Sequence, residues 1–100
     1  MQKIIFTFLI LTFYLIIMHE IYLAEQVVQE IIKKAQEEKA KEILEATIAI
    51  PKNEHFTEKE FKSILENQAI DTIVSKTKFN VIKEDTPRVY LKDIKVHPVK

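Results

Sequence analysis

Hydrophobic and polar positions divide this chain into an apolar N-terminal quarter and a mixed remainder. Residues 4–18 carry no charge and are almost all aliphatic or aromatic. As a helix they would cover roughly 22 Å, which is shorter than the hydrocarbon core of a bilayer, about 30 Å. Ile21–Ala24 prolong the apolar character beyond His19-Glu20, so the segment from Ile4 to Ala24 is long enough to cross. We therefore predict a transmembrane anchor over residues 1–24.

Both ends of this segment carry residues that suit a membrane–water boundary. Lys3 can extend its ammonium group toward one headgroup layer, and Tyr22 suits the other. His19 and Glu20 mark the level at which the helix leaves the hydrocarbon. A functional pairing of these two residues inside the membrane, as a proton relay or a counter-charge to a neighbouring subunit, is the less favoured interpretation. Because a base precedes the segment and acids follow it, we expect a single-pass topology in the cell membrane, with the N-terminus cytoplasmic and the rest extracytoplasmic.

A cleaved signal peptide is the main alternative for the same segment, because residues 4–18 have the length of a signal-peptide core. Signal peptidase requires small residues at positions −3 and −1 of its cleavage site. Cleavage after Ala24 would place Tyr22 at −3, and the next small residue is Ala35. We favour the uncleaved anchor, and a secreted protein remains the alternative.

After the anchor, apolar residues recur every three or four positions, as they do along one face of a helix. We call this set the stripe: Ala24, Val27, Val28, Ile31, Ile32 and Ala35. Acidic and basic residues four apart, from Glu30 and Lys34 to Lys41 and Glu45, each favour the helix by about 0.2–0.5 kcal/mol. Since no helix breaker occurs between Gln2 and Ile50, we predict an amphipathic helical stalk over residues 25–46, continuous with the anchor.

The stripe is longer than the elements that follow it can cover. We expect only Ile43 and Leu44, farther along the same predicted helix, to pack on the C-terminal half of the chain. The stripe itself is then predicted to bind a protein partner or further copies of this chain.

Residues 47–100 are predicted to form a small head that begins with a short strand candidate and a second helix. The clearest local signal is the hexapeptide FTEKEF. Thr57 and Glu60 have the spacing of a capping box, with Thr57 as the N-cap. Phe56 and Phe61 have the spacing of the hydrophobic staple that accompanies it. A second, short helix should therefore begin after Thr57.

Beyond residues 69–76, which fit a helix or a strand equally well, the pattern is typical of β-structure. Residues 78–83 and 88–97 flank the turn-type tetrapeptide EDTP. They predict a C-terminal antiparallel β-hairpin or small sheet. In the second strand the apolar residues change parity midway, so we expect a β-bulge near Lys92-Asp93 or a strand that twists between two environments. The predicted fold class is α+β: a long N-terminal helix, a second short helix and this β-structure.

Composition excludes several classes of function. The chain has no glycine and no cysteine. Without glycine it lacks the P-loop, the dinucleotide-binding fingerprint and the nucleophile elbow. His19, His55 and His97 lie in three separate predicted elements, and the basic excess near the C-terminus matches no nucleic-acid motif. We predict no enzymatic activity, no catalytic, cofactor or metal site, no small-molecule substrate and no nucleic-acid partner.

The overall layout resembles that of pilin-like proteins, and most of all the small TadE-like components of Tad-type pilus systems. IIFTFLILTFYLIIMHEIYLAEQVVQEIIKKA corresponds to anchor and stalk, and FTEKEF with KFNVIKEDTPRVYLKDIKV corresponds to the head. The resemblance implies a structural or assembly subunit of a cell-envelope complex. A single-pass accessory or regulatory binding module of a larger membrane complex is the alternative.

Overall fold

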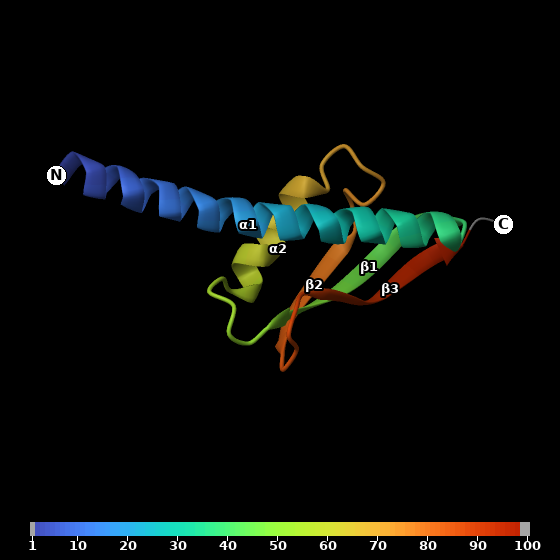
Figure 1. The fold of residues 1–100 in the computed structure, drawn as a ribbon. Helices are drawn as coiled ribbons and strands as arrows, with labels where there is room; N and C mark the ends of the chain where they lie inside the picture. The colour runs from blue at the N-terminus through green and yellow to red at the C-terminus, as the bar shows by residue number, and fades with distance from the viewer. Residues whose placement is uncertain (1, 99–100) are drawn as a thin grey trace.

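The computed structural model describes the backbone of residues 2–98 and the side chains of residues 18–97. It contains two helices and three strands: α1 (Gln2–Glu37), β1 (Ala40–Pro51), α2 (Glu58–Gln68), β2 (Lys78–Glu84) and β3 (Tyr90–Pro98) (Figure 1). The strands form one mixed sheet in the order β2-β1-β3. The predicted α+β class is confirmed.

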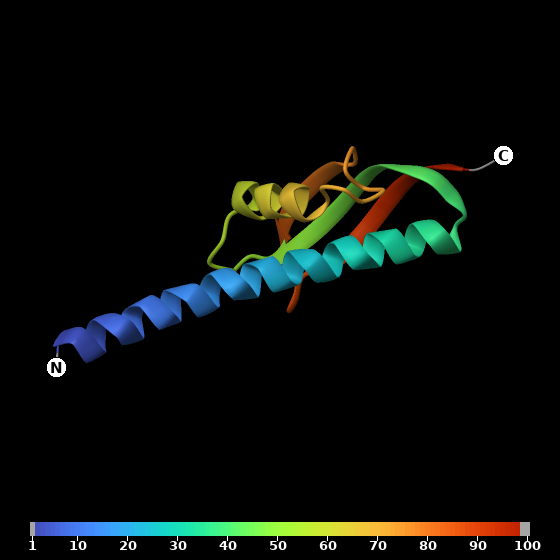
Figure 2. The same ribbon diagram turned by 90° about the horizontal axis from the view of Figure 1, so that it is seen from above.

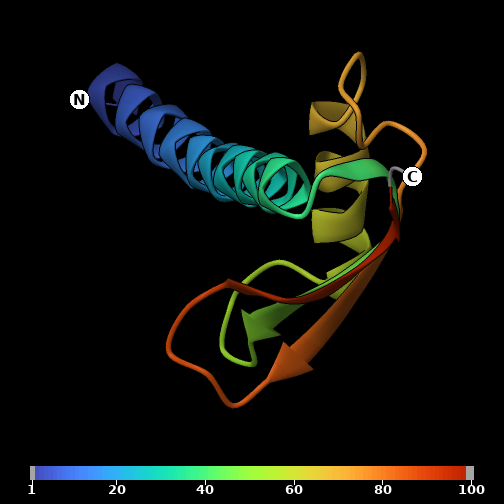
Figure 3. The same ribbon diagram turned by 90° about the vertical axis from the view of Figure 1, so that its right-hand side faces the viewer.

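The sheet and the two helices form two layers. β1 pairs in parallel with β2 and antiparallel with β3, so the central strand is the first one in the sequence. Within the described residues, α1 contacts β1 and β3, while α2 contacts α1 and β2. Both helices lie on the same side of the sheet (Figure 3). The apolar core therefore lies between the helices and one face of the sheet.

The predicted helical stalk over residues 25–46 is wrong in its last turns. α1 ends at Glu37, and Lys39 takes the left-handed conformation with φ of 54°. This position usually holds glycine, which the chain lacks. The following residues form the first half of β1 because apolar side chains such as Ile43 and Ala46 fill the core from a central strand. That burial outweighs the small gains from charged pairs on a longer helix.

The start of α2 agrees with its prediction. Thr57 is the N-cap, and its hydroxyl accepts a hydrogen bond from the Glu60 amide at 3.1 Å. The Glu60 carboxylate accepts one from the Thr57 amide at 2.9 Å. The rings of Phe56 and Phe61 stack with centroids 5.0 Å apart and are buried. Capping box and staple are both confirmed.

The predicted hairpin does not form, although β2 and β3 occupy the predicted segments. β1 lies between them, so the chain makes a β1-α2-β2 crossover and β3 returns along the other edge of β1. Residues 85–89 can reach roughly 17 Å when extended. That exceeds the ~10 Å across one intervening strand. Residues 69–76, which had no clear prediction, form turns rather than a helix or strand.

The predicted bulge in β3 is confirmed. Thr47 pairs with Asp93 and Ile48 pairs with Leu91, so Lys92 has no partner on β1. The extra residue returns the apolar side chains of β3 to one face. Three apolar residues of β3 pack against the core: Leu91, Ile94 and Val96. Val89, just before the strand, packs against it as well.

The stripe on α1 lies in the same core. Five of its residues are buried, and Ile32 is partly buried against them: Ala24, Val27, Val28, Ile31 and Ala35. Ile43 is buried as predicted, whereas Leu44 is exposed because it sits at an irregularity in the pairing of β1 with β3. The sheet and α2 cover the stripe, which the sequence analysis did not anticipate. Stalk and head consequently share one core.

Most of the predicted anchor lies outside the residues whose side chains are described. Figure 2 shows the N-terminal half of α1 extending beyond the sheet and α2. Among the described residues, no helical segment is both long and apolar enough to cross a bilayer.

Candidate functional site at the helix–head junction

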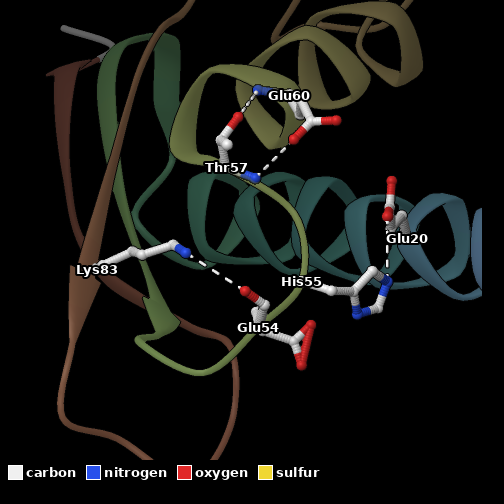
Figure 4. A network of polar contacts seen from close by, with 6 residues as sticks. All are labelled: Glu20, Glu54, His55, Thr57, Glu60 and Lys83. Atoms are coloured by element: carbon white, nitrogen blue, oxygen red, sulfur yellow. Dashed lines mark hydrogen bonds and ion pairs between the residues drawn. The ribbon is translucent and has the colours of Figure 1, made fainter.

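Three segments far apart in sequence meet where α1 enters the head. They are α1 at Glu20, residues 52–57 between β1 and α2, and the end of β2 at Lys83 (Figure 4). The meeting point lies next to the predicted membrane exit. We define the junction as six residues: Glu20, Glu54, His55, Thr57, Glu60 and Lys83.

An ion pair between Glu20 and His55 connects α1 to the 52–57 segment. His55 Nε2 lies 3.3 Å from Glu20 Oε1, and this contact is an ion pair only when the imidazole is protonated. The Glu20 side chain is 15% exposed. The His55 ring also meets the Phe56 ring edge-on, with centroids 5.5 Å apart. Because Phe56 is buried, this contact orients His55 toward α1. Glu20 thereby has a partner inside its own chain.

Lys83 and Glu54 connect the same segment to the sheet. Lys83 Nζ donates to the backbone oxygen of Glu54 at 3.3 Å. Glu54 Oε2 is buried, and no hydrogen-bond partner for it occurs in the described part of the chain. A buried carboxylate oxygen without a partner costs about 1–3 kcal/mol or more. Glu54 is therefore the one member of the junction that the observed contacts do not fully explain.

The capping box closes the junction on the α2 side. A hydrogen bond from the Thr57 backbone amide lowers the pKa of Glu60 from its ordinary value most, and one with the Thr57 hydroxyl lowers it further. Glu60 is thus held in its charged form, which suits the positive end of the α2 dipole. This arrangement anchors the 52–57 segment at its C-terminal end.

The contacts of the junction hold α1, residues 52–57 and β2 together. Its groups bind one another, and residues 18–97 contain no cluster of three or more His, Asp or Glu arranged to hold a metal ion. The arrangement orients the head relative to α1.

The structure distributes the predicted membrane-edge residues differently. His19 is exposed, and Tyr22 is 60% exposed. Glu20 turns toward the head, while Lys3 lies outside the described side chains. The sequence pattern gave His55 no partner, and its side chain is 51% exposed. No local signal would have joined it to Glu20, because that contact depends on how the head folds back onto α1.

No family model matches the chain, and no curated protein matches it. Among solved structures, it is similar in fold to the nickel metallochaperone HypA from Helicobacter pylori, with a TM-score of 0.61 and 14% sequence identity. The similarity covers 75% of this chain and 97% of that one. At this identity the likeness concerns the fold alone.

Proposed function

We propose that this protein is a membrane-anchored, outward-facing, non-enzymatic subunit of a cell-envelope assembly, with the pilin-like layout described above. Residues 1–24 anchor it, and the α+β head lies on the extracytoplasmic side. The observation that supports this most strongly is the junction. Glu20 binds the head at the point where the apolar segment ends, so a head attached in this way would stand at a fixed orientation just above the bilayer.

The shared core supports the same proposal. Residues 24–35 of α1 supply one wall of the core, so the head cannot swing about a linker. A fixed orientation is useful to a subunit that must present one surface to its neighbours, and a simple tether would not need it. Met18 and Tyr22 remain exposed on α1 beside the predicted membrane exit.

The role of nickel metallochaperone, named for the structural neighbour, is not part of this proposal. The chain has no cysteine, and its described residues offer no three-ligand cluster.

Single-cysteine labelling tests the topology, because the native chain has no cysteine. Ser75→Cys places a thiol on the exposed turn segment of the head, and Gln2→Cys places one at the N-terminal end of the anchor. In intact cells, a membrane-impermeant maleimide should label Ser75→Cys alone, and Gln2→Cys should react only after the membrane is opened. The reverse pattern would contradict the outward orientation. An intact mass that lacks the first 24 residues would replace the anchor with a cleaved signal peptide.

Cross-linking in membranes separates an assembly subunit from an accessory binding module. The stripe is covered by the head, so association through it would require the head to detach. Exposed positions on the opposite face of α1 are the better probes. Gln29→Cys should give a cross-linked self-dimer if copies assemble along α1, and adducts only to other proteins would favour the accessory module.

A further inference from the structure

We propose that the outer edge of β2 accepts an extended acidic segment of a protein partner, which adds to the sheet as a fourth strand. Strand addition of this kind uses main-chain hydrogen bonds for affinity and side-chain chemistry for specificity. It requires an accessible and regular strand edge, with surroundings that select one class of segment.

β2 has a regular edge. It pairs with β1 in an unbroken parallel register from Lys78 opposite Glu45 to Glu84 opposite Pro51. Its other side has no neighbouring strand in the described sheet. An edge strand of this kind presents unpaired N–H and C=O groups that can template another strand. In contrast, irregular pairing and Lys92 interrupt the other edge strand, β3.

The edge of β2 is also accessible. A surface hollow of about 440 Å³ lies between α2 and this strand. Four consecutive residues of β2, from Phe79 to Ile82, line it. Consecutive residues point to opposite faces of a sheet, so a hollow lined by all four must open onto the strand edge itself.

The charges around the hollow favour an acidic occupant. Lys59 and Lys62 of α2 line it, with Glu58 as the one acid. Lys78 begins the strand; its side chain is 68% exposed, and its Nζ lies 4.0 Å from Glu45 Oε1. Glu84 at the other end already accepts hydrogen bonds from Tyr90 and Lys92. Lys59 and Lys62 therefore make the charge around the hollow mainly positive, while Val81 and Ile82 offer one apolar contact on each face of the sheet.

A second copy of the chain fits this edge less well. Antiparallel pairing of two β2 strands about a two-fold axis would reverse the in-plane direction of α1 between the copies. Their N-termini would then point in opposite directions, which one bilayer does not permit for two single-pass anchors. This step alone rests on the proposed function.

A peptide-binding measurement on the full chain in detergent micelles tests the proposal. The probe is a fluorescein-labelled heptapeptide in which valine and glutamate alternate. We expect it to bind and to slow hydrogen exchange at amides of residues 78–84. A peptide with lysine in place of glutamate should bind about tenfold more weakly or worse, a difference of about 1.4 kcal/mol. A valine–glutamate peptide N-methylated at alternate residues should also bind about tenfold more weakly or worse. Its methylated amides cannot donate main-chain hydrogen bonds to the edge of β2.

The charge-reversal variant Lys59→Glu/Lys62→Glu should weaken binding of the acidic peptide by about tenfold. Lys33→Glu/Lys34→Glu, on the exposed face of α1, is a control of equal charge change. Equal binding of the N-methylated peptide would overturn the proposal. So would concentration-dependent protection of residues 78–84 in the chain alone, because it would identify a second copy as the occupant. None of these outcomes depends on membrane anchoring, so failure here and failure of the labelling test are separable.

Discussion

β2 and β3 flank the same central strand, yet they are held there in different ways. β2 pairs in parallel with β1 in a continuous register, and α2 packs against it. β3 pairs antiparallel with three register shifts, and α1 packs against it. Phe79 of β2 is buried, whereas the apolar side chains of β3 are only partly buried.

The difference follows from how each strand reaches its place. β2 arrives through a helical crossover that brings α2 onto the same flank, so the strand gains a regular ladder and a covering helix together. β3 arrives through the short 85–89 segment and must adjust its register to keep its apolar residues facing the core. Regular pairing leaves β2 with an open edge, and the bulge at Lys92 makes the edge of β3 a poorer template.

The largest expected effect on stability comes from truncating a core residue on β2, and a core residue on β3 serves as the comparison. Phe79→Ala should reduce the free energy of unfolding by about 3–5 kcal/mol, because it leaves a cavity under α2. Leu91→Ala on β3 should cost less, about 2 kcal/mol or below, because that side chain is only partly buried. Urea unfolding of the full chain in mild detergent measures both. Equal losses would mean that the two flanks are equally well packed.

A smaller effect is expected where β2 begins. The buried Thr77 hydroxyl donates to the Ile43 carbonyl oxygen at 2.8 Å and so ties the start of β2 to β1. Thr77→Val leaves that carbonyl without its partner and should cost about 1–3 kcal/mol in the same unfolding measurement. Thr77→Ser keeps the hydroxyl and should recover most of the loss. If the serine variant were as unstable as the valine variant, the hydrogen bond would not be the cause.

The capping box tests the helix that covers β2. Thr57→Ala removes the hydroxyl that accepts from the Glu60 amide and should lower stability by about 1 kcal/mol. Thr86→Ala, in the segment between β2 and β3, removes an exposed hydroxyl that donates to the Arg88 carbonyl oxygen. It should change stability by less than about 0.5 kcal/mol. A comparable loss in both variants would indicate that α2 does not depend on its cap.

The smallest effect concerns the contact that joins the two flanking strands to each other. Glu84 of β2 accepts hydrogen bonds from Lys92, and from the Tyr90 hydroxyl at 2.7 Å. The hydrogen bond from Lys92 lowers the pKa of Glu84 most, and the one from Tyr90 lowers it further. Glu84 in turn raises the pKa values of Tyr90 and Lys92. Because the folded-state pKa of Glu84 is lowered, its contribution is present above the ordinary carboxyl pKa and is lost as pH falls through the lowered value.

The pH dependence has the opposite sign for Tyr90 and Lys92, because their folded-state pKa values are raised. Their contributions to stability are present at lower pH and are lost as pH rises through the raised pKa values. An NMR titration of the Glu84 carboxyl carbon should show the lowered pKa, and Lys92→Met should move it upward. Glu84→Gln should remove this share of the pH dependence of unfolding at both extremes. An unchanged Glu84 titration in Lys92→Met would mean that the contact does not persist in solution.

Local signals in the sequence were sufficient for α2 and for the positions of β2 and β3. A capping box and its staple act between residues three to five apart, so the chain forms them wherever it begins a helix. The bulge near Lys92 could be predicted for a similar reason, because side-chain parity along one strand shows whether an extra residue is needed.

The sequence by itself determined which segments carry apolar periodicity and where α2 begins, and it limited β3 to a bulge or a twist. Only the tertiary structure decided the end of α1, the central place of β1, the separation of β2 from β3 and the contact of Glu20 with His55. Each of these depends on residues far apart in the chain, whose pairing is favoured by the burial of a common core and not by neighbouring residues. The residues that sequence patterns predicted for a partner along the stripe were needed for that core.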